Sequence, residues 1–196
     1  YIWPLVKLNE DLAASSPLTS ELLTEAAQIA FRGETMTDRV RQLTGELAGA
    51  EFEADNAAAF YSYSSPAEDV AMLFEAYMMY RKYGALSDFA FVSIPQTTSY
   101  TCNDWKVLWG QRSRLSEEGV LDRAVFVAQG ILDKSEASIR AELASLPAAP
   151  EVLASGSGWC ESQQISQAYA ESRSLLSSSV ASGFGDNARY KEDLED

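Results

Sequence analysis

The chain has 196 residues, of which 29 are acidic and 15 are basic, so that its formal net charge is −14, and it contains no histidine. Without histidine, the chain itself cannot build a Ser-His-Asp or Cys-His catalytic arrangement, or a zinc site of the HExxH type. The strong acidity argues against a nucleic-acid partner, because neutralising phosphates requires clustered Lys and Arg side chains. With 46% apolar residues and no apolar run of membrane-spanning length, the sequence predicts a globular protein without a transmembrane segment.

Helix signals dominate the N-terminal part of the chain. The pair Ser16-Pro17 is typical of the N-cap and first residue of a helix, which we expect to continue through Arg32. Thr35 or Thr37 is the expected cap of a second helix, because apolar residues follow at helical spacing up to a stop near Gly49.

The clearest helix signal in the sequence comes next. Ser65 as N-cap, Pro66 as the first helical residue and Glu68 at the third position form a capping box. The helix is expected to run from Asp69 to Tyr83 and to end at a glycine. The apolar run Phe89–Ile94, which a proline closes, is the best candidate for a strand.

Two further helices are predicted, one from Ser116 to Leu132 and one that is capped by Asp133 or Ser135 and broken at Pro147. The sequence thus predicts a mainly α, single-domain, bundle-like fold with one or two short strands. We expect a helical core domain over residues 1–146, a Pro/Gly/Ser linker over 147–160, a C-terminal helix packed on the core over 161–182, and an acidic tail over 183–196.

The two cysteines, Cys102 and Cys160, lie 58 positions apart and form no CxxC motif. A lone reactive thiol is one interpretation, and a disulfide is the one that we favour. In the chain-entropy model, closing a loop of that length stabilises the fold by roughly 4 kcal/mol. A disulfide predicts an exported protein, whether periplasmic, extracellular or at the cell surface.

Three carboxylates near the start of the Ser65 helix are candidates for chemistry. Glu68 and Glu75 lie seven residues apart on one helix face, and Asp69 is adjacent to the first of them. Paired carboxylates can hold a cation or act as general acid and base. The alternative is structural: Glu68 completes the capping box, Asp69 complements the helix dipole and Glu75 is a solvated surface charge.

One basic cluster stands out in the acidic chain, formed by Lys106, Arg112, Arg114 and Arg123. Such a cluster can receive an anionic ligand or partner. We expect instead that its members pair with the nearby acidic residues Glu117, Glu118 and Asp122.

The segment Asp55–Glu75 (DNAAAFYSYSSPAEDVAMLFE) resembles the region that follows HExxH in gluzincin-type zinc metallopeptidases, and the similarity extends to about Ile94. In that family, a helix that opens with S-P-x-E-D and continues with A-x-x-F-E provides the third zinc ligand and its supporting residues. The resemblance implies that Glu68 is the metal ligand and Asp69 a supporting acid. Residues that it places around the site are Tyr61, Tyr63, Asp69 and Glu75.

The family also requires two histidines four residues apart on a helix, and this chain has none. Glu68 alone cannot hold Zn²⁺ in a tetrahedral site. Either the histidine helix belongs to a segment upstream of this chain, or the domain is a non-catalytic relative. The start at Tyr1, with no initiator Met, indicates a processed or excerpted polypeptide and keeps the first possibility open.

The leading hypothesis is an exported binding or assembly module without catalytic residues, which resembles a metallopeptidase scaffold that lacks its metal site. Such a module needs no cofactor, and its partner is another protein or a second copy of the chain. The first alternative is the C-terminal portion of an active secreted zinc metallopeptidase, whose HExxH helix lies outside this chain; zinc is expected only in that case. The second alternative is a structural subunit of an extracellular assembly.

Overall fold

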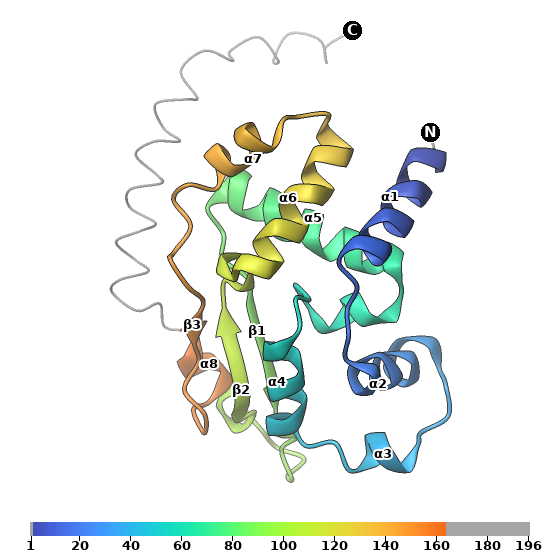
Figure 1. The fold of residues 1–196 in the computed structure, drawn as a ribbon. Coiled ribbons are helices and arrows are strands. Elements are labelled where there is room, and N and C mark those ends of the chain that lie inside the picture. Colours follow the sequence, from blue (N-terminus) through green and yellow to red (C-terminus); the bar gives the residue numbers. More distant parts are fainter. Residues whose placement is uncertain (1, 164–196) are drawn as a thin grey trace, which may run out of the picture. The chain divides into compact units, whose positions relative to one another are not determined.

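The computed structural model describes residues 2–163, with side chains from residue 4 onward, and this part of the chain is mainly helical (Figure 1). The predicted fold class is confirmed at that level. Of the helix predicted over 161–182, only residues 161–163 are described, and the predicted tail over 183–196 lies outside the described residues. The helices are α1 (Ile2–Ser15), α2 (Glu21–Arg32), α3 (Asp38–Arg41), α4 (Gly45–Ala54), α5 (Pro66–Tyr83), α6 (Glu118–Leu132), α7 (Glu136–Glu142) and α8 (Trp159–Ser162).

A small antiparallel sheet has the strand order β1-β2-β3. β1 (Asp88–Val92) corresponds to the predicted strand, and it pairs along its length with β2 (Val107–Arg112), which the sequence did not predict. β3 (Glu151–Val152) lies in the segment predicted as a linker and pairs with the end of β2. Residues 2–163 therefore contain three short strands where one or two were expected.

The start of α2 differs from the prediction. Ser16 directly follows the last residue of α1 and its backbone N–H donates to the carbonyl of Leu12 (2.9 Å), whereas Ser20 is the N-cap of α2. The physical reason is Asp55, whose carboxylate accepts hydrogen bonds from the backbone N–H groups of Thr19 (2.8 Å) and Ser20 (2.9 Å). These bonds use the N–H groups of residues just before α2, so the prediction that Ser16 caps this helix is wrong.

Other helix boundaries also differ from those predicted from the sequence. The single helix predicted up to Gly49 is split in two, because Thr37 caps α3 and Thr44 caps α4 through its own side chain. Ser116 does not cap α6, which begins two residues later; it belongs to a 3₁₀ turn and its hydroxyl pairs with that of Ser113 (2.9 Å). Of the two caps proposed for α7, Ser135 is the one used.

α5 agrees with its local sequence signals. It begins at Pro66 behind the N-cap Ser65 and ends at Tyr83, where Gly84 takes a left-handed conformation with φ of 59°. Glycine adopts this conformation without steric cost, and it closes the helix by donating to a carbonyl of the last turn.

An aromatic core lies between α4 and the sheet. Phe52 of α4 stacks on Phe89 of β1 (4.5 Å between ring centroids) and contacts Trp109 of β2 edge to face (5.5 Å). The helix comes this close because it turns two glycines toward β2. A Cβ on Gly49 would stand only 2.1 Å from Trp109, and one on Gly45 would meet the neighbouring leucine of β2 at 2.5 Å.

A second group of buried side chains joins α1, α5 and α6. Buried, mostly aliphatic side chains of these helices stabilise them by removing apolar area from water. The members of this group include Leu12, Leu73, Tyr77, Val120, Ala124 and Val127. Together with the α4–sheet core, it holds the segment between α4 and α5 from two sides.

The predicted disulfide is confirmed. Cys102 and Cys160 are bonded, with their Cα atoms 5.7 Å apart, and the bond ties the loop between β1 and β2 to α8. Hydrogen bonds reinforce this connection, among them one from the backbone N–H of Glu161 to Asn103 (3.0 Å). Among the described helices, none combines the length and the apolar character that crossing a membrane requires.

Candidate functional site

Four of the residues singled out by the sequence, Tyr61, Tyr63, Glu68 and Asp69, lie around the first turn of α5. The Ser65 hydroxyl accepts a hydrogen bond from the backbone N–H of Glu68 (3.3 Å), and Pro66 occupies the first helical position. Glu68 and Asp69 follow in the first turn, where negative charge is stabilised by the helix dipole. The two carboxylates leave the helix in different directions and have different surroundings.

Glu68 is half-buried and faces the 3₁₀ turn η1 (Phe60–Ser64). The hydrogen bond between the Tyr61 hydroxyl and Glu68 raises the pKa of that tyrosine, and desolvation and the charge of Glu68 act in the same direction. The Tyr61 ring packs edge to face against Phe31 of α2 (4.8 Å). Within residues 2–163, no Lys or Arg forms an ion pair with Glu68.

Asp69 is buried and belongs to an ion pair with Arg123 of α6, which is 2% exposed. The guanidinium donates to both carboxylate oxygens and also to the backbone carbonyls of Ser16 (3.1 Å) and Asn56 (2.7 Å). Burial raises the pKa of the Asp69 carboxyl, and Arg123 acts against this rise. The role of Asp69 is therefore to join helices, beyond the helix-dipole effect expected from its position.

Tyr63 is the second site tyrosine, and it points into the protein. Its hydroxyl donates to Asp55 (3.2 Å), and burial, followed by the charge of Asp55, raises its pKa far above the usual range. The phenol therefore stays protonated at neutral pH. Tyr63 and Tyr61, two residues apart in η1, thus point to different carboxylates.

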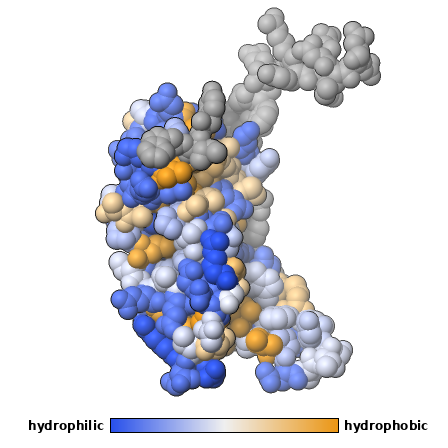
Figure 2. Space-filling model, turned by 90° about the vertical axis from the view of Figure 1, so that its right-hand side faces the viewer, coloured by the Kyte–Doolittle hydropathy of each residue, from blue (hydrophilic) through white to orange (hydrophobic). Residues whose placement is uncertain are grey.

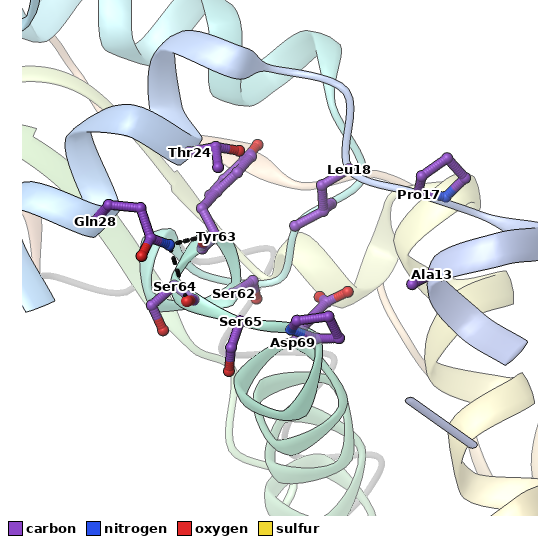
Figure 3. A pocket seen from close by; sticks show the side chains of 11 residues that line it. Ala13, Pro17, Leu18, Thr24, Gln28, Ser62, Tyr63, Ser64, Ser65 and Asp69 are labelled. Atoms are coloured by element: carbon purple, nitrogen blue, oxygen red, sulfur yellow. Dashed lines mark hydrogen bonds between the residues drawn. The ribbon is translucent and has the colours of Figure 1, made fainter. Parts of the chain in front are cut away.

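A cavity of about 330 Å³ opens beside the start of α5, and we refer to it as the α5 hollow (Figure 3). Figure 3 shows the Ser62–Ser65 segment and Asp69 on one side of it and Leu18 on the other. Gln28 of α2 holds this segment by donating to the carbonyl of Ser64 (3.0 Å). The Ser64 hydroxyl is buried and has no hydrogen-bond partner among the described residues. The lining residues are Ala13, Pro17, Leu18, Thr24, Gln28, Ser62, Tyr63, Ser64, Ser65, Pro66 and Asp69.

Glu75 lies elsewhere on α5. Seven residues of helix separate it from Glu68, which corresponds to about 10 Å along the axis. One cation cannot bind both carboxylates at that distance, because metal–oxygen bonds are shorter than about 3 Å. Glu75 is exposed and borders a different cavity, so the structure brings Tyr63 and Asp69 to the α5 hollow and leaves Glu75 outside it.

The described residues do not by themselves fit a zinc site. Within residues 2–163 there is no group of three or more Cys, Asp or Glu side chains placed to hold a metal ion. Asp69 is engaged by Arg123, and Glu68 is a single carboxylate.

The basic cluster does not form in the predicted way. Arg112 pairs with Asp88 of β1 and with a glutamate of β3, and Arg123 pairs with Asp69. Arg114 is 1% exposed and donates to three backbone carbonyls around the end of α4, while its guanidinium lies 4.7 Å from the centre of the Phe52 ring. The ion pairs of Arg112 and Arg123 are thus formed with acidic residues other than the expected Glu117, Glu118 and Asp122, and these arginines connect distant elements.

Three residues were not assigned to the site from the sequence, although one of them, Arg123, was named in the basic cluster. Asp55, Gln28 and Arg123 each bind across more than 30 positions of sequence. One of them left a signal: Arg123 sits among the apolar positions of α6, three residues after Val120 and next to Ala124. A cation within an apolar helix face indicates a buried acidic or carbonyl partner.

Comparisons of the chain with protein-family models, with curated proteins and with solved structures gave no match. The geometry of the α5 hollow and of its surroundings is therefore the basis for the functional proposal.

Proposed function

We propose that this chain is an exported, non-catalytic binding domain on a bundle-like helical scaffold, and that the α5 hollow receives a segment of a protein partner. The observation that carries the proposal is the hollow itself, one side of which is the Ser62–Ser65 segment that Gln28 holds in place. The hollow is large enough for one or two side chains of a peptide.

The chemistry of the lining favours binding over catalysis. Tyr63 is held protonated by burial, and Asp69 is neutralised by its ion pair with Arg123. Neither group is free to act as a general base near neutral pH. The remaining lining residues offer aliphatic surface and hydroxyl groups, which suit an apolar side chain flanked by peptide amides.

Export is supported by the disulfide between Cys102 and Cys160, both of which are exposed. Accessible disulfides persist in oxidising compartments and are reduced in the cytosol of most organisms. A binding domain of this kind would meet its partner outside the cytosol.

The face drawn in Figure 2 favours a binding domain over a subunit of a large assembly. On the face in Figure 2, apolar residues form separate patches among polar ones and no continuous band. Obligate assemblies bury broad apolar surfaces, generally more than about 2,000 Å² in total. A monodisperse monomer in light scattering is the expected result, and a stable oligomer would favour the assembly alternative.

The proposal is tested by selecting peptides from a random library on the immobilised full chain and measuring their affinity in solution. Ala13 lines the hollow and the adjacent Ala14 does not, although both are exposed on α1. We expect Ala13→Phe to weaken the selected peptides at least about tenfold by filling the hollow, and the matched control Ala14→Phe to leave affinity within about twofold. Equal affinity for both variants, or no enriched peptide, would contradict the proposal.

The resemblance to gluzincins keeps one alternative, in which this chain is the C-terminal portion of a zinc metallopeptidase. The observation in its favour is Glu68, which lies on the first turn of α5 and forms no ion pair within residues 2–163. Under this alternative a longer polypeptide with an upstream HExxH segment binds one zinc per chain and loses it on Glu68→Gln. In the same assay Glu75→Gln retains zinc; a longer chain without zinc would rule this alternative out.

A further inference from the structure

A second cavity lies farther along α5, and none of the residues that line it lines the α5 hollow. It has a volume of about 200 Å³ and lies between the middle of the helix, the Ala58–Ala59 segment and the connection that leads into β1. We refer to it as the methionine slot. The residues that line it are Ala58, Ala59, Met72, Glu75, Ala76, Met79, Ala85, Leu86 and Ser87.

The walls of the methionine slot are almost entirely aliphatic. Four alanines keep it narrow, and Met72 and Met79 provide flexible thioether chains that adapt to the shape of a guest. Met79 is 43% exposed in the free protein, so apolar surface that a ligand can cover is already at the rim. This lining favours an unbranched aliphatic chain.

One charged side chain borders the slot. Glu75 is exposed, and within residues 2–163 it has no ion-pair or hydrogen-bond partner. The chain as a whole carries a net charge of −14, which attracts cationic groups to its surface. An aliphatic slot that ends at a free carboxylate is complementary to an alkyl chain that ends in a cation.

We propose that the methionine slot binds a lysine side chain of a protein partner, with the four methylene groups between Met72 and Met79 and the ammonium group on Glu75. Lysine normally buries its stem along apolar surface and keeps its charged end in water, which is the arrangement that an exposed carboxylate at the rim allows. The ion pair would add charge-assisted hydrogen bonds to the apolar contact.

The test uses the full chain with ¹³C-labelled methionine methyl groups and two small probes, Nα-acetyl-lysine methylamide and Nα-acetyl-norleucine methylamide. The chain has four methionines, and Met36, outside the slot, serves as an internal reference. We expect the lysine probe to shift the Met72 and Met79 signals saturably, and the norleucine probe to bind about threefold to fivefold more weakly because it lacks the ammonium group. No saturable shift, or equal binding of both probes, would overturn the proposal.

Two pairs of variants locate the binding. Glu75→Gln should weaken the lysine probe about threefold to fivefold, whereas Glu10→Gln, at an exposed glutamate of α1, changes the net charge equally and should have less than about a twofold effect. Ala76→Leu fills the slot and should abolish the shifts, and Ala71→Leu, exposed on the same helix, should preserve them. Unchanged affinity in Glu75→Gln, or equal loss in both leucine variants, would contradict a lysine site.

Discussion

Arg123 and Asp69 form a buried ion pair that connects α6 to the first turn of α5. The same guanidinium donates to the carbonyls of Ser16 and Asn56, so that one side chain joins four segments around the α5 hollow. Removing one partner of a buried pair leaves the other charge without compensation in a poorly solvated place. The hollow therefore depends on a residue that does not line it.

We predict that Arg123→Met lowers the free energy of unfolding by about 3–5 kcal/mol. The double variant with Asp69→Asn should recover part of the loss, because the uncompensated charge is removed, although the bonds to Ser16 and Asn56 remain absent. Urea denaturation, followed by circular dichroism, measures the free energy of unfolding of the single and the double variant. The control is Arg140→Met: its ion pairs are exposed, and the expected loss is below about 1 kcal/mol.

The close contact between α4 and β2 leads to a second prediction, which concerns the stability of a variant at Gly49. A Cβ on Gly49 would overlap the Trp109 side chain at 2.1 Å, so Gly49→Ala must move the helix or the indole. We expect a loss of about 1–3 kcal/mol in unfolding free energy and an altered tryptophan fluorescence spectrum.

The matched control for Gly49→Ala is Gly130→Ala in α6. There the new methyl group meets only the end of the Leu8 side chain, at 2.8 Å, and that end can rotate away. Alanine also favours the helix over glycine by up to about 1 kcal/mol, so little net change is expected. Equal losses in the two variants would show that the contact with Trp109 does not limit the α4–sheet packing.

The fold was predictable where the determinants are local. α5 follows from Ser65, Pro66 and Gly84, which act on neighbouring residues through a cap, a fixed φ and a left-handed turn. The start of α2 could not be predicted, because Asp55, which binds the residues before the helix, is 35 positions away from Ser20. β2 was missed for a related reason, since its place depends on pairing with β1 and on a glycine face of α4.

The candidate site shows the same division between local and distant determinants. The position of Glu68 on the first helical turn could be read from the sequence, and so could the nearness of Tyr61 and Tyr63 to that turn. The burial of Asp69 could not, because its partner Arg123 is 54 residues away. Local patterns therefore located the site, and long-range contacts decided what its carboxylates do.

Glu142 of α7 is expected to make the stability of the fold depend on pH in the acidic range. It accepts a hydrogen bond from Tyr77 and forms ion pairs with Arg81 (2.9 Å) and Lys134. Partial burial acts to raise the pKa of Glu142, but the hydrogen bonds from Lys134 and Tyr77 and the two positive charges lower it overall. The folded protein therefore binds this proton less readily than the unfolded chain, and stability should fall as pH drops below the usual glutamate pKa of about 4.5.

Glu142→Gln should reduce this acid dependence and lower the unfolding free energy at neutral pH by about 1–2 kcal/mol, because the ion pairs are lost. The measurement is urea denaturation at a series of pH values from about 7 to 3. Glu10→Gln is the control, since its exposed carboxylate should leave the slope unchanged. Identical pH slopes for the wild type and Glu142→Gln would contradict the proposed role.

Tyr80 of α5 gives the opposite pH dependence. Its side chain is buried, its hydroxyl has no hydrogen-bond partner among residues 2–163, and burial raises the pKa of Tyr80 to about 12. Between pH 10, where an unfolded tyrosine ionises, and about 12, the unfolded chain loses the proton first, so stability should fall as pH rises.

Tyr80→Phe should lessen this alkaline loss and leave neutral stability unchanged or raised by up to about 1 kcal/mol, because no hydrogen bond is removed. Thermal unfolding at several alkaline pH values tests this, with Tyr83→Phe, 71% exposed on the same helix, as the control that should behave like the wild type.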